Sequence, residues 1–218
     1  MINKNLLTGH WCVTAAPLFD VVGGRGIPQL VHTDNDRSGT NLQTALLVVD
    51  LQQALCDAAP PHAMQLVIER IKELLGWADA HSLPVAFVQH WTEPGTILDK
   101  GSAGWQLASE VRDYPPSFHH EKNVLSSFED GQLHAWLQAH DIRRLCISGM
   151  QTEYCVSAAC EAAAALGYEV IVPIDAHMTI DGPEKSAGQI IDETNDRLRA
   201  SALCLPVASL VAQYAAVG

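Results

Sequence analysis

Residues 145–159 limit the chain to folds in which a buried strand turns directly into a helix. The stretch begins with the apolar run Leu145–Ile147, reaches Gly149, and continues through a polar turn into alanine-rich sequence. A short apolar run with β-branched members predicts a strand, and the small residues that follow favour a helix. Cys155 then lies at or next to a helix N-terminus, where unpaired N–H groups and the helix dipole favour a thiolate. We expect Cys155 to be a nucleophile, the alternative being a buried structural cysteine.

The rest of the chain alternates between the patterns of buried strands and of helices. Residues 45–49 form a continuous apolar run, typical of a parallel strand covered on both faces, and the run ends at Asp50. Residues 62–80 carry apolar side chains at helical spacing, and residues 84–89 return to a strand, which predicts a βαβ unit. Further strands are expected at 170–174 and 205–208, and further helices at 129–139 and 183–203.

Composition argues against several classes of partner. The 218 residues include 13 Lys+Arg and 25 Asp+Glu, and this formal charge of −12 disfavours nucleic acid and anionic membrane surfaces. The six cysteines form no CxxC pair, which indicates free thiols in a reducing compartment, with the cytoplasm as the expected location. No apolar stretch approaches the roughly 20 residues of a membrane span, and no signal peptide is apparent.

Residues 1–43 show no sustained periodicity. Several glycines and the polar run at residues 32–41 interrupt any strand or helix pattern. We expect an irregular N-terminal arm over residues 1–43 that lies on the body or on a neighbouring subunit. Residues 44–218 are then expected to form a single domain, large enough to bury a sizeable core.

Two charged residues accompany Cys155 near the expected ends of strands. Asp50 ends the first strand, at the edge where open parallel sheets gather their ligands. Lys122, if it faces Asp50 and Cys155, would hold the carboxylate ionised and lower the pKa of the thiol. The alternatives are a capping or loop hydrogen bond for Asp50 and a solvated surface position for Lys122.

A long loop follows the second strand and supplies candidates for a substrate pocket. Trp91 and Trp105 lie in this loop, and two indoles there would make a wall for an apolar or planar substrate, the alternative being simple loop packing. Phe128, Tyr154 and His177 are further candidates for lining the pocket of a small-molecule substrate.

Three motifs together resemble the isochorismatase-like cysteine hydrolase superfamily. They are Asp50 within residues 47–52, Lys122 within residues 122–128 and Cys155 within residues 149–156, and the resemblance covers about residues 44–213. It implies a doubly wound α/β fold, a three-layer αβα sandwich with a mainly parallel six-stranded sheet. It also makes residues 44–218 an isochorismatase-like hydrolase domain, expected to assemble into homodimers or homotetramers.

The resemblance implies a mechanism as well. Cys155 would be the nucleophile, Asp50 its general base and Lys122 the cationic partner of both, acting through a thioester acyl-enzyme without a cofactor. A cis peptide bond is implied at Met150–Gln151, and the N–H groups of Gln151 and Cys155 would form the oxyanion hole.

Departures from the family pattern reduce the number of reactions that we expect of this chain. Nicotinamidases of this superfamily carry an Asp-x-His pair and further histidines that hold a metal, whereas this chain has Gln89-His90-Trp91 at that point, so no metal is expected. His90 is interpreted as structural. Because ether hydrolysis needs only an acid, the presence of Cys155 favours cleavage of an amide or carbamoyl C–N bond. Two alternatives stay open: isochorismatase-type vinyl-ether hydrolysis, and a redox-responsive or ligand-binding protein without turnover.

Overall fold

The structure is a computed structural model that describes residues 43–215, so residues 1–42 of the predicted arm lie outside the described residues. The strands are β1 (Thr44–Val49), β2 (Val85–His90), β3 (Phe118–Lys122), β4 (Arg144–Met150), β5 (Glu169–Pro173), β6 (His177–Met178) and β7 (Leu203–Leu205). The helices are α1 (Gln53–Ala58), α2 (Pro61–Ala80), α3 (Gln132–Ala139), α4 (Ser157–Ala165), α5 (Ala187–Leu198) and α6 (Val207–Ala215), with a π-helical turn, η2 (Thr152–Val156), before α4.

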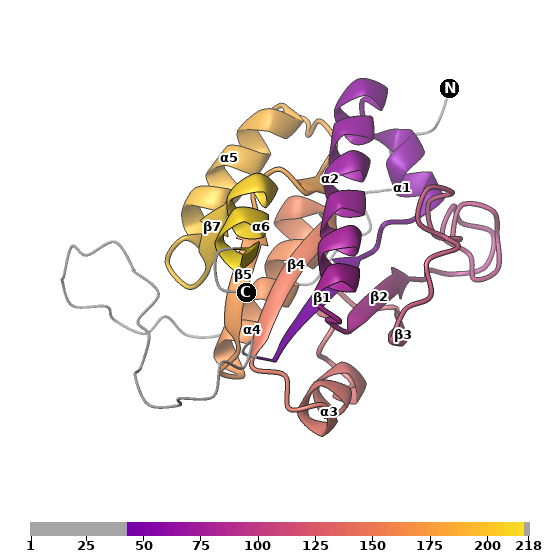
Figure 1. Cartoon of the computed structure of the whole chain (residues 1–218). Helices are drawn as coiled ribbons and strands as arrows, with labels where there is room; N and C mark the ends of the chain where they lie inside the picture. Colours follow the sequence, from indigo (N-terminus) through magenta and orange to yellow (C-terminus); the bar gives the residue numbers. More distant parts are fainter. Residues whose placement is uncertain (1–42, 216–218) are drawn as a thin grey trace, which may run out of the picture. The chain divides into compact units, whose positions relative to one another are not determined.

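The strands form one parallel sheet (Figure 1). Its order is β3-β2-β1-β4-β5-β7, and the short β6 pairs with the end of β4. The predicted parallel sheet is therefore confirmed, with β6 added to the six strands of the main order. Since every paired strand runs in the same direction, the carboxyl ends of β1, β2, β3 and β4 meet at one edge.

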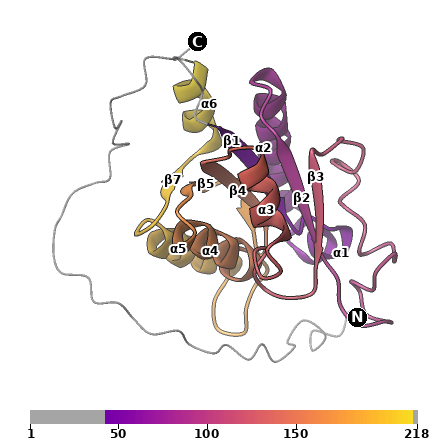
Figure 2. The same cartoon turned by 90° about the horizontal axis from the view of Figure 1, so that it is seen from below.

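The sheet separates two apolar cores. On β1, Leu46 and Val48 point into one core and Leu47 and Val49 into the other, because successive side chains alternate between the two faces. Side chains of α1, α2 and α6 fill the first core, whereas α3, α4 and α5 contribute to the second. Figure 2 shows α2 and α6 on one side of the strands and α3, α4 and α5 on the other. The doubly wound three-layer sandwich is confirmed.

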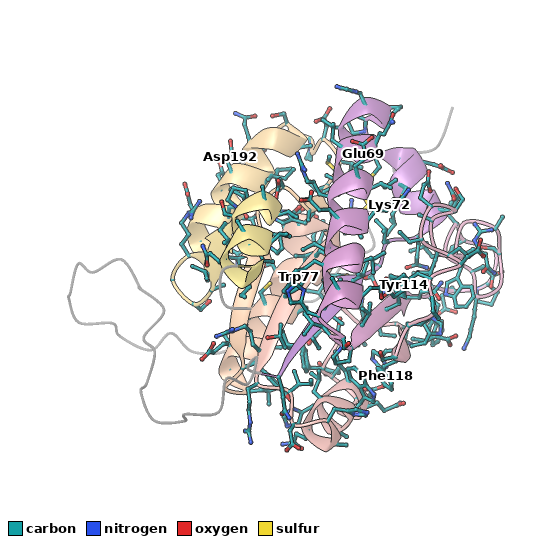
Figure 3. The ribbon with its side chains drawn as sticks, viewed as in Figure 1. Glu69, Lys72, Trp77, Tyr114, Phe118 and Asp192 are labelled. Carbon is teal, nitrogen blue, oxygen red and sulfur yellow. The ribbon has the colours of Figure 1, made fainter. Side chains whose placement is uncertain are left out.

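Helix α2 illustrates why these segments are amphipathic. Ile71 and Leu74 on its inner face are fully buried, while Glu69 and Lys72 lie on the exposed face, where Figure 3 shows them. Burial of such an apolar stripe against the sheet stabilises the helix more than its intrinsic propensity does. No helix within residues 43–215 has both the length and the apolar character needed to cross a membrane.

The predicted limits of the helix at 183–203 and of the strand at 205–208 are wrong, since α5 spans Ala187–Leu198 and β7 spans Leu203–Leu205. Helix α5 begins at Ala187 rather than at Pro183, because Ser186 and Gln189 form a capping box in which each side chain accepts from the other residue's backbone N–H. The last strand ends at Leu205, and the residues after Pro206 turn into α6, where Asp175 Oδ1 accepts from the Val207 N–H.

Candidate active site

The sheet brings the three predicted catalytic residues to one edge. Lys122 is the last residue of β3 and pairs with His90, the last residue of β2. Asp50 directly follows β1, the strand between β2 and β4. Cys155 lies in η2, the turn that leaves β4. Residues far apart in sequence therefore meet because each ends, or follows, a strand of the same parallel sheet.

The Lys122 ammonium connects these side chains. Its Nζ donates to Asp50 Oδ2 at 2.7 Å, and to Cys155 Sγ and the Val124 carbonyl at 3.2 Å each. Its Nζ also lies 3.2 Å from His90 Nδ1. Asp50 and Lys122 are only 1% and 4% exposed, so water screens their interaction little. The expected grouping of Asp50, Lys122 and Cys155 is found in the structure.

The protonation states of Lys122 and His90 differ for a physical reason. Burial acts to lower the pKa of Lys122, but the Asp50 carboxylate and the hydrogen bonds to Asp50 and Cys155 outweigh burial, so that pKa is raised and the lysine stays an ammonium. Burial and the neighbouring ammonium lower the pKa of His90 to about 4, which keeps its ring neutral near pH 7. The contact of His90 with Lys122 was not predicted. The sequence held one indication of it, because a polar residue at the end of an apolar strand often faces a site.

The pKa of the Cys155 thiol differs from the expectation. Burial and the Asp50 carboxylate raise its pKa, and they outweigh the lowering effect of Lys122. The lowering effect predicted for Lys122 is present, but burial, which spacing along the chain does not show, shifts the pKa of the thiol the other way. Cys155 is half-buried, in contrast to Cys146 and Cys160, which are enclosed in the apolar cores.

One carboxylate oxygen of Asp50 is available to accept a proton. Oδ2 accepts from Lys122, whereas Oδ1 is buried and accepts no hydrogen bond from the described residues. An unpaired buried carboxylate oxygen costs stability, and such a group is therefore often found where it has a catalytic role. Because the same carboxylate acts on the Cys155 thiol, the arrangement suits proton transfer from sulfur to Asp50.

The turn that carries Cys155 has unusual backbone geometry. The Met150–Gln151 peptide bond is cis, as the resemblance implies. The Gln151 carbonyl accepts from the N–H groups of Tyr154 and Val156, which fixes the start of η2. Gly149 has φ of 119°, and a side chain there would collide with the backbone of Val49. A glycine is required where β4 passes β1 so closely.

The predicted pocket residues have different environments. Trp91 and Trp105 are half-buried, and the Trp105 carbonyl accepts from Gln52 Nε2 and Gln89 Nε2, which anchors the long loop to the carboxyl edge. Tyr154 is 44% exposed beside Cys155.

The other two pocket candidates are enclosed. Phe128 is a core side chain whose ring packs at a tilt against Tyr168. His177 is buried and hydrogen-bonded through both ring nitrogens. The pocket-lining role of Phe128 and His177 stays a prediction.

The site also contains groups of the kinds that bind metals. Ligand atoms of Asp50, His90 and Cys155 all lie within 4.8 Å of one another. The Lys122 ammonium contacts all three, so a positive charge is already present among them and a cation would have to displace it.

A separate hollow of about 560 Å³ lies at the opposite edge of the sheet, lined by residues that precede or begin strands, among them Thr44, Pro84 and Ser117. The strand topology places it away from Cys155.

Comparisons with known proteins agree with this geometry. The Isochorismatase domain family matches residues 44–190. Streptothricin hydrolase from Streptomyces noursei is 35% identical over 141 residues, which cover 64% of this chain and 51% of that protein. Ureidoacrylate amidohydrolase RutB from Stutzerimonas stutzeri is 28% identical over 180 residues, which cover 65% of this chain and 72% of that protein. This chain spans about half the length of the streptothricin hydrolases it matches, 51% and 56%.

The fold is also found among solved structures. A cysteine hydrolase from Pseudomonas syringae pv. phaseolicola superposes with a TM-score of 0.75 at 19% identity, covering 84% of this chain and 97% of that one. At that identity the likeness shows the fold alone.

Proposed function

Because the chain belongs to the isochorismatase family, we propose that it is a cysteine hydrolase that cleaves an amide or carbamoyl C–N bond of a small molecule. The observation that carries this proposal is the Lys122 ammonium, which bonds both the Asp50 carboxylate and the Cys155 sulfur. The names of two relatives, a streptothricin hydrolase and an amidohydrolase, support hydrolysis, and the second name supports an amide substrate.

The proposed reaction begins from a neutral thiol. Asp50 Oδ1 accepts the Cys155 proton as the sulfur attacks the substrate carbonyl, and the Lys122 ammonium stabilises the thiolate that develops. The N–H groups of Gln151 and Cys155 would bind the oxyanion. Asp50 then gives the proton to the leaving amine. Water hydrolyses the thioester, which releases the acid and restores the thiol.

Intact-mass spectrometry and turnover assays of Cys155→Ala test the nucleophile. We expect a panel of small amides, carbamoyl compounds and electrophilic amide analogues to leave a covalent adduct on the wild type alone, and turnover of any substrate to fall by roughly 1,000-fold or more. Cys204→Ala is the matched control, because Cys204 is another half-buried free thiol but lies outside the site.

Two outcomes would overturn the proposal. If the panel is extended with vinyl ethers and one of them is hydrolysed, with that turnover retained in Cys155→Ala and lost in Asp50→Ala, the reaction is vinyl-ether hydrolysis by an acid. If no compound is turned over and Cys155 instead oxidises reversibly, the chain is a redox-responsive or ligand-binding protein.

We propose in addition that the protein works as a homodimer or homotetramer in the cytoplasm, on a small-molecule substrate and without a nucleic-acid partner. The free thiols among the described cysteines support a reducing compartment. Light scattering of the full chain would measure the subunit number.

A further inference from the structure

A row of three buried polar side chains adjoins the turn that carries Cys155. Thr152 Oγ1 lies 2.9 Å from His177 Nδ1, and His177 Nε2 lies 3.0 Å from Asn195 Oδ1. Thr152, His177 and Asn195 are 0%, 1% and 6% exposed and belong to η2, β6 and α5 respectively. The row therefore connects three separate elements through one imidazole ring.

The chemistry of the three groups fixes the direction of the hydrogen bonds. Asn195 Oδ1 is an acceptor, so His177 Nε2–H donates to it. A neutral ring then accepts at Nδ1, from the hydroxyl of Thr152. Burial lowers the pKa of His177 to about 4, which keeps the ring neutral near pH 7. Both ring nitrogens are thus satisfied, and a satisfied buried network holds its members in one arrangement.

Thr152 is well placed to orient the nucleophile. It is the first residue of η2, directly after Gln151, whose carbonyl accepts from the Tyr154 and Val156 N–H groups on either side of Cys155. A hydrogen bond that fixes Thr152 therefore also fixes the backbone leading to the sulfur. We propose that His177 is a positioning residue that aligns the Cys155 turn with Asp50 and Lys122, an inference that rests on the proposed cysteine hydrolase function.

Docking of α5 does not depend on this row. Arg197 of α5 donates to Ser157 Oγ of α4 at 2.9 Å and forms an ion pair with Glu161 of the same helix. Leu198 is fully enclosed in the apolar core beneath α5. Since α5 is held by these contacts, loss of the His177 bonds is expected to act on the turn and not on the docking of α5. The turn has a further hydrogen bond, donated by Thr179 Oγ1 to Glu153 Oε1, which does not involve His177.

The test compares variants that remove the row with a control that removes an equivalent bond elsewhere. Thr152→Val deletes the hydroxyl and keeps the shape, His177→Ala deletes the ring, and His177→Gln supplies an amide that can accept from Thr152 and donate to Asn195. Tyr168→Phe is the control, because its hydroxyl bonds His134 Nδ1 at 2.8 Å, a contact outside the Cys155 turn. Circular dichroism and the Tm report whether each variant folds.

The first readout needs no substrate. The pH midpoint for alkylation of Cys155 by iodoacetamide is followed by intact mass, with Cys155→Ala as background. The groups that face the sulfur are Asp50, Lys122 and, next to the lysine, His90. If the turn loses its hydrogen bond, the thiol becomes more exposed and moves away from Asp50. We therefore expect the pH midpoint to fall toward that of an ordinary cysteine in Thr152→Val and His177→Ala. The pH midpoint should be unchanged in His177→Gln and Tyr168→Phe.

The second readout is turnover of a substrate found by the amide panel. We expect kcat to fall by roughly 10- to 100-fold in Thr152→Val and His177→Ala, with KM little changed, since small misplacements of a nucleophile have effects of this size. His177→Gln should recover part of the loss. The double variant should lose no more than the worse single variant, because both remove the same coupling.

The outcomes separate this inference from the proposed function. An unshifted midpoint and a wild-type kcat in Thr152→Val, or losses no larger than in Tyr168→Phe, would overturn the positioning role while leaving Cys155 as the nucleophile. A shifted midpoint in a protein that hydrolyses nothing would support the positioning of the thiol and refute the hydrolase. Thr152→Val keeps the test decisive if His177→Ala does not fold.

Discussion

Lys122 determines the electrostatics of the site at the scale of single residues. An ammonium has three N–H groups, yet Asp50, His90, Val124 and Cys155 all place an oxygen, nitrogen or sulfur within 3.2 Å of its Nζ. It cannot donate fully to all four at once. A thiolate accepts more strongly than a thiol, so ionisation of Cys155 is expected to draw an N–H group toward the sulfur.

Removing the charge of Asp50 should make the thiol more acidic. The Asp50 carboxylate raises the pKa of Cys155 and Lys122 lowers it, so Asp50→Asn removes a raising influence and leaves the lowering one. We expect the pH midpoint for iodoacetamide alkylation of Cys155 to be above the ordinary cysteine value in the wild type and lower in Asp50→Asn. Asp57→Asn, an exposed carboxylate on α1, should leave it unchanged. A midpoint that rises in Asp50→Asn would contradict the charge assignment.

Asp50, Lys122 and Cys155 could be predicted from the sequence because each follows or closes a strand pattern. The environment of these three residues could not be predicted from the sequence. The pKa of Cys155 depends on burial and on the distance to Asp50, neither of which can be obtained from spacing along the chain. Phe128 and His177 were predicted to line a pocket but are enclosed, because a side chain near a strand end can point into the core as readily as toward a ligand.

At the scale of elements, the close approach of β1 and β4 at their carboxyl ends depends on Gly149. Its φ of 119° is unfavourable for other residues, and an added Cβ would strike the Val49 backbone. We expect Gly149→Ala to lower the free energy of unfolding by roughly 2 to 5 kcal/mol. Gly167→Ala is the control, because Gly167 also has positive φ but open space around it, and it should cost only about 1–2 kcal/mol. Equal losses in urea denaturation would show that the close approach is unimportant.

Sequence patterns identified most elements but not all of their limits. The strands β1, β2, β4 and β5 and the helix α2 were predictable because their apolar patterns are continuous. The strands β3 and β6 were not predicted, because β3 is mostly polar and β6 has two residues. The start of α5 was available in the Ser186 and Gln189 pair and was missed. The π-helical turn η2 was not predictable, because its i→i+5 pattern results from how β4, β6 and α5 meet around it.

At the scale of the described domain, the sheet divides the interior into two separate cores. Ile71 of α2 is fully buried in one and Leu137 of α3 in the other. We expect Ile71→Ala and Leu137→Ala each to lower the free energy of unfolding by about 2–5 kcal/mol. Since Ile71 and Leu137 belong to separate cores on opposite faces of the sheet, the double variant should lose the sum within about 0.5 kcal/mol. A larger deviation in denaturant titrations would mean that the sheet transmits the change between its faces.

The buried ion pair of Asp50 and Lys122 has a consequence for how this protein can be engineered. Both side chains are almost fully enclosed, and each holds its charge against the other. Replacing such a buried ion pair by apolar residues is often neutral or stabilising by roughly 1–4 kcal/mol. Directed evolution for heat resistance alone is therefore expected to discard Asp50 and Lys122 together. A screen for variants of higher thermal stability therefore has to select for turnover in the same round. Otherwise it will select stable variants without activity.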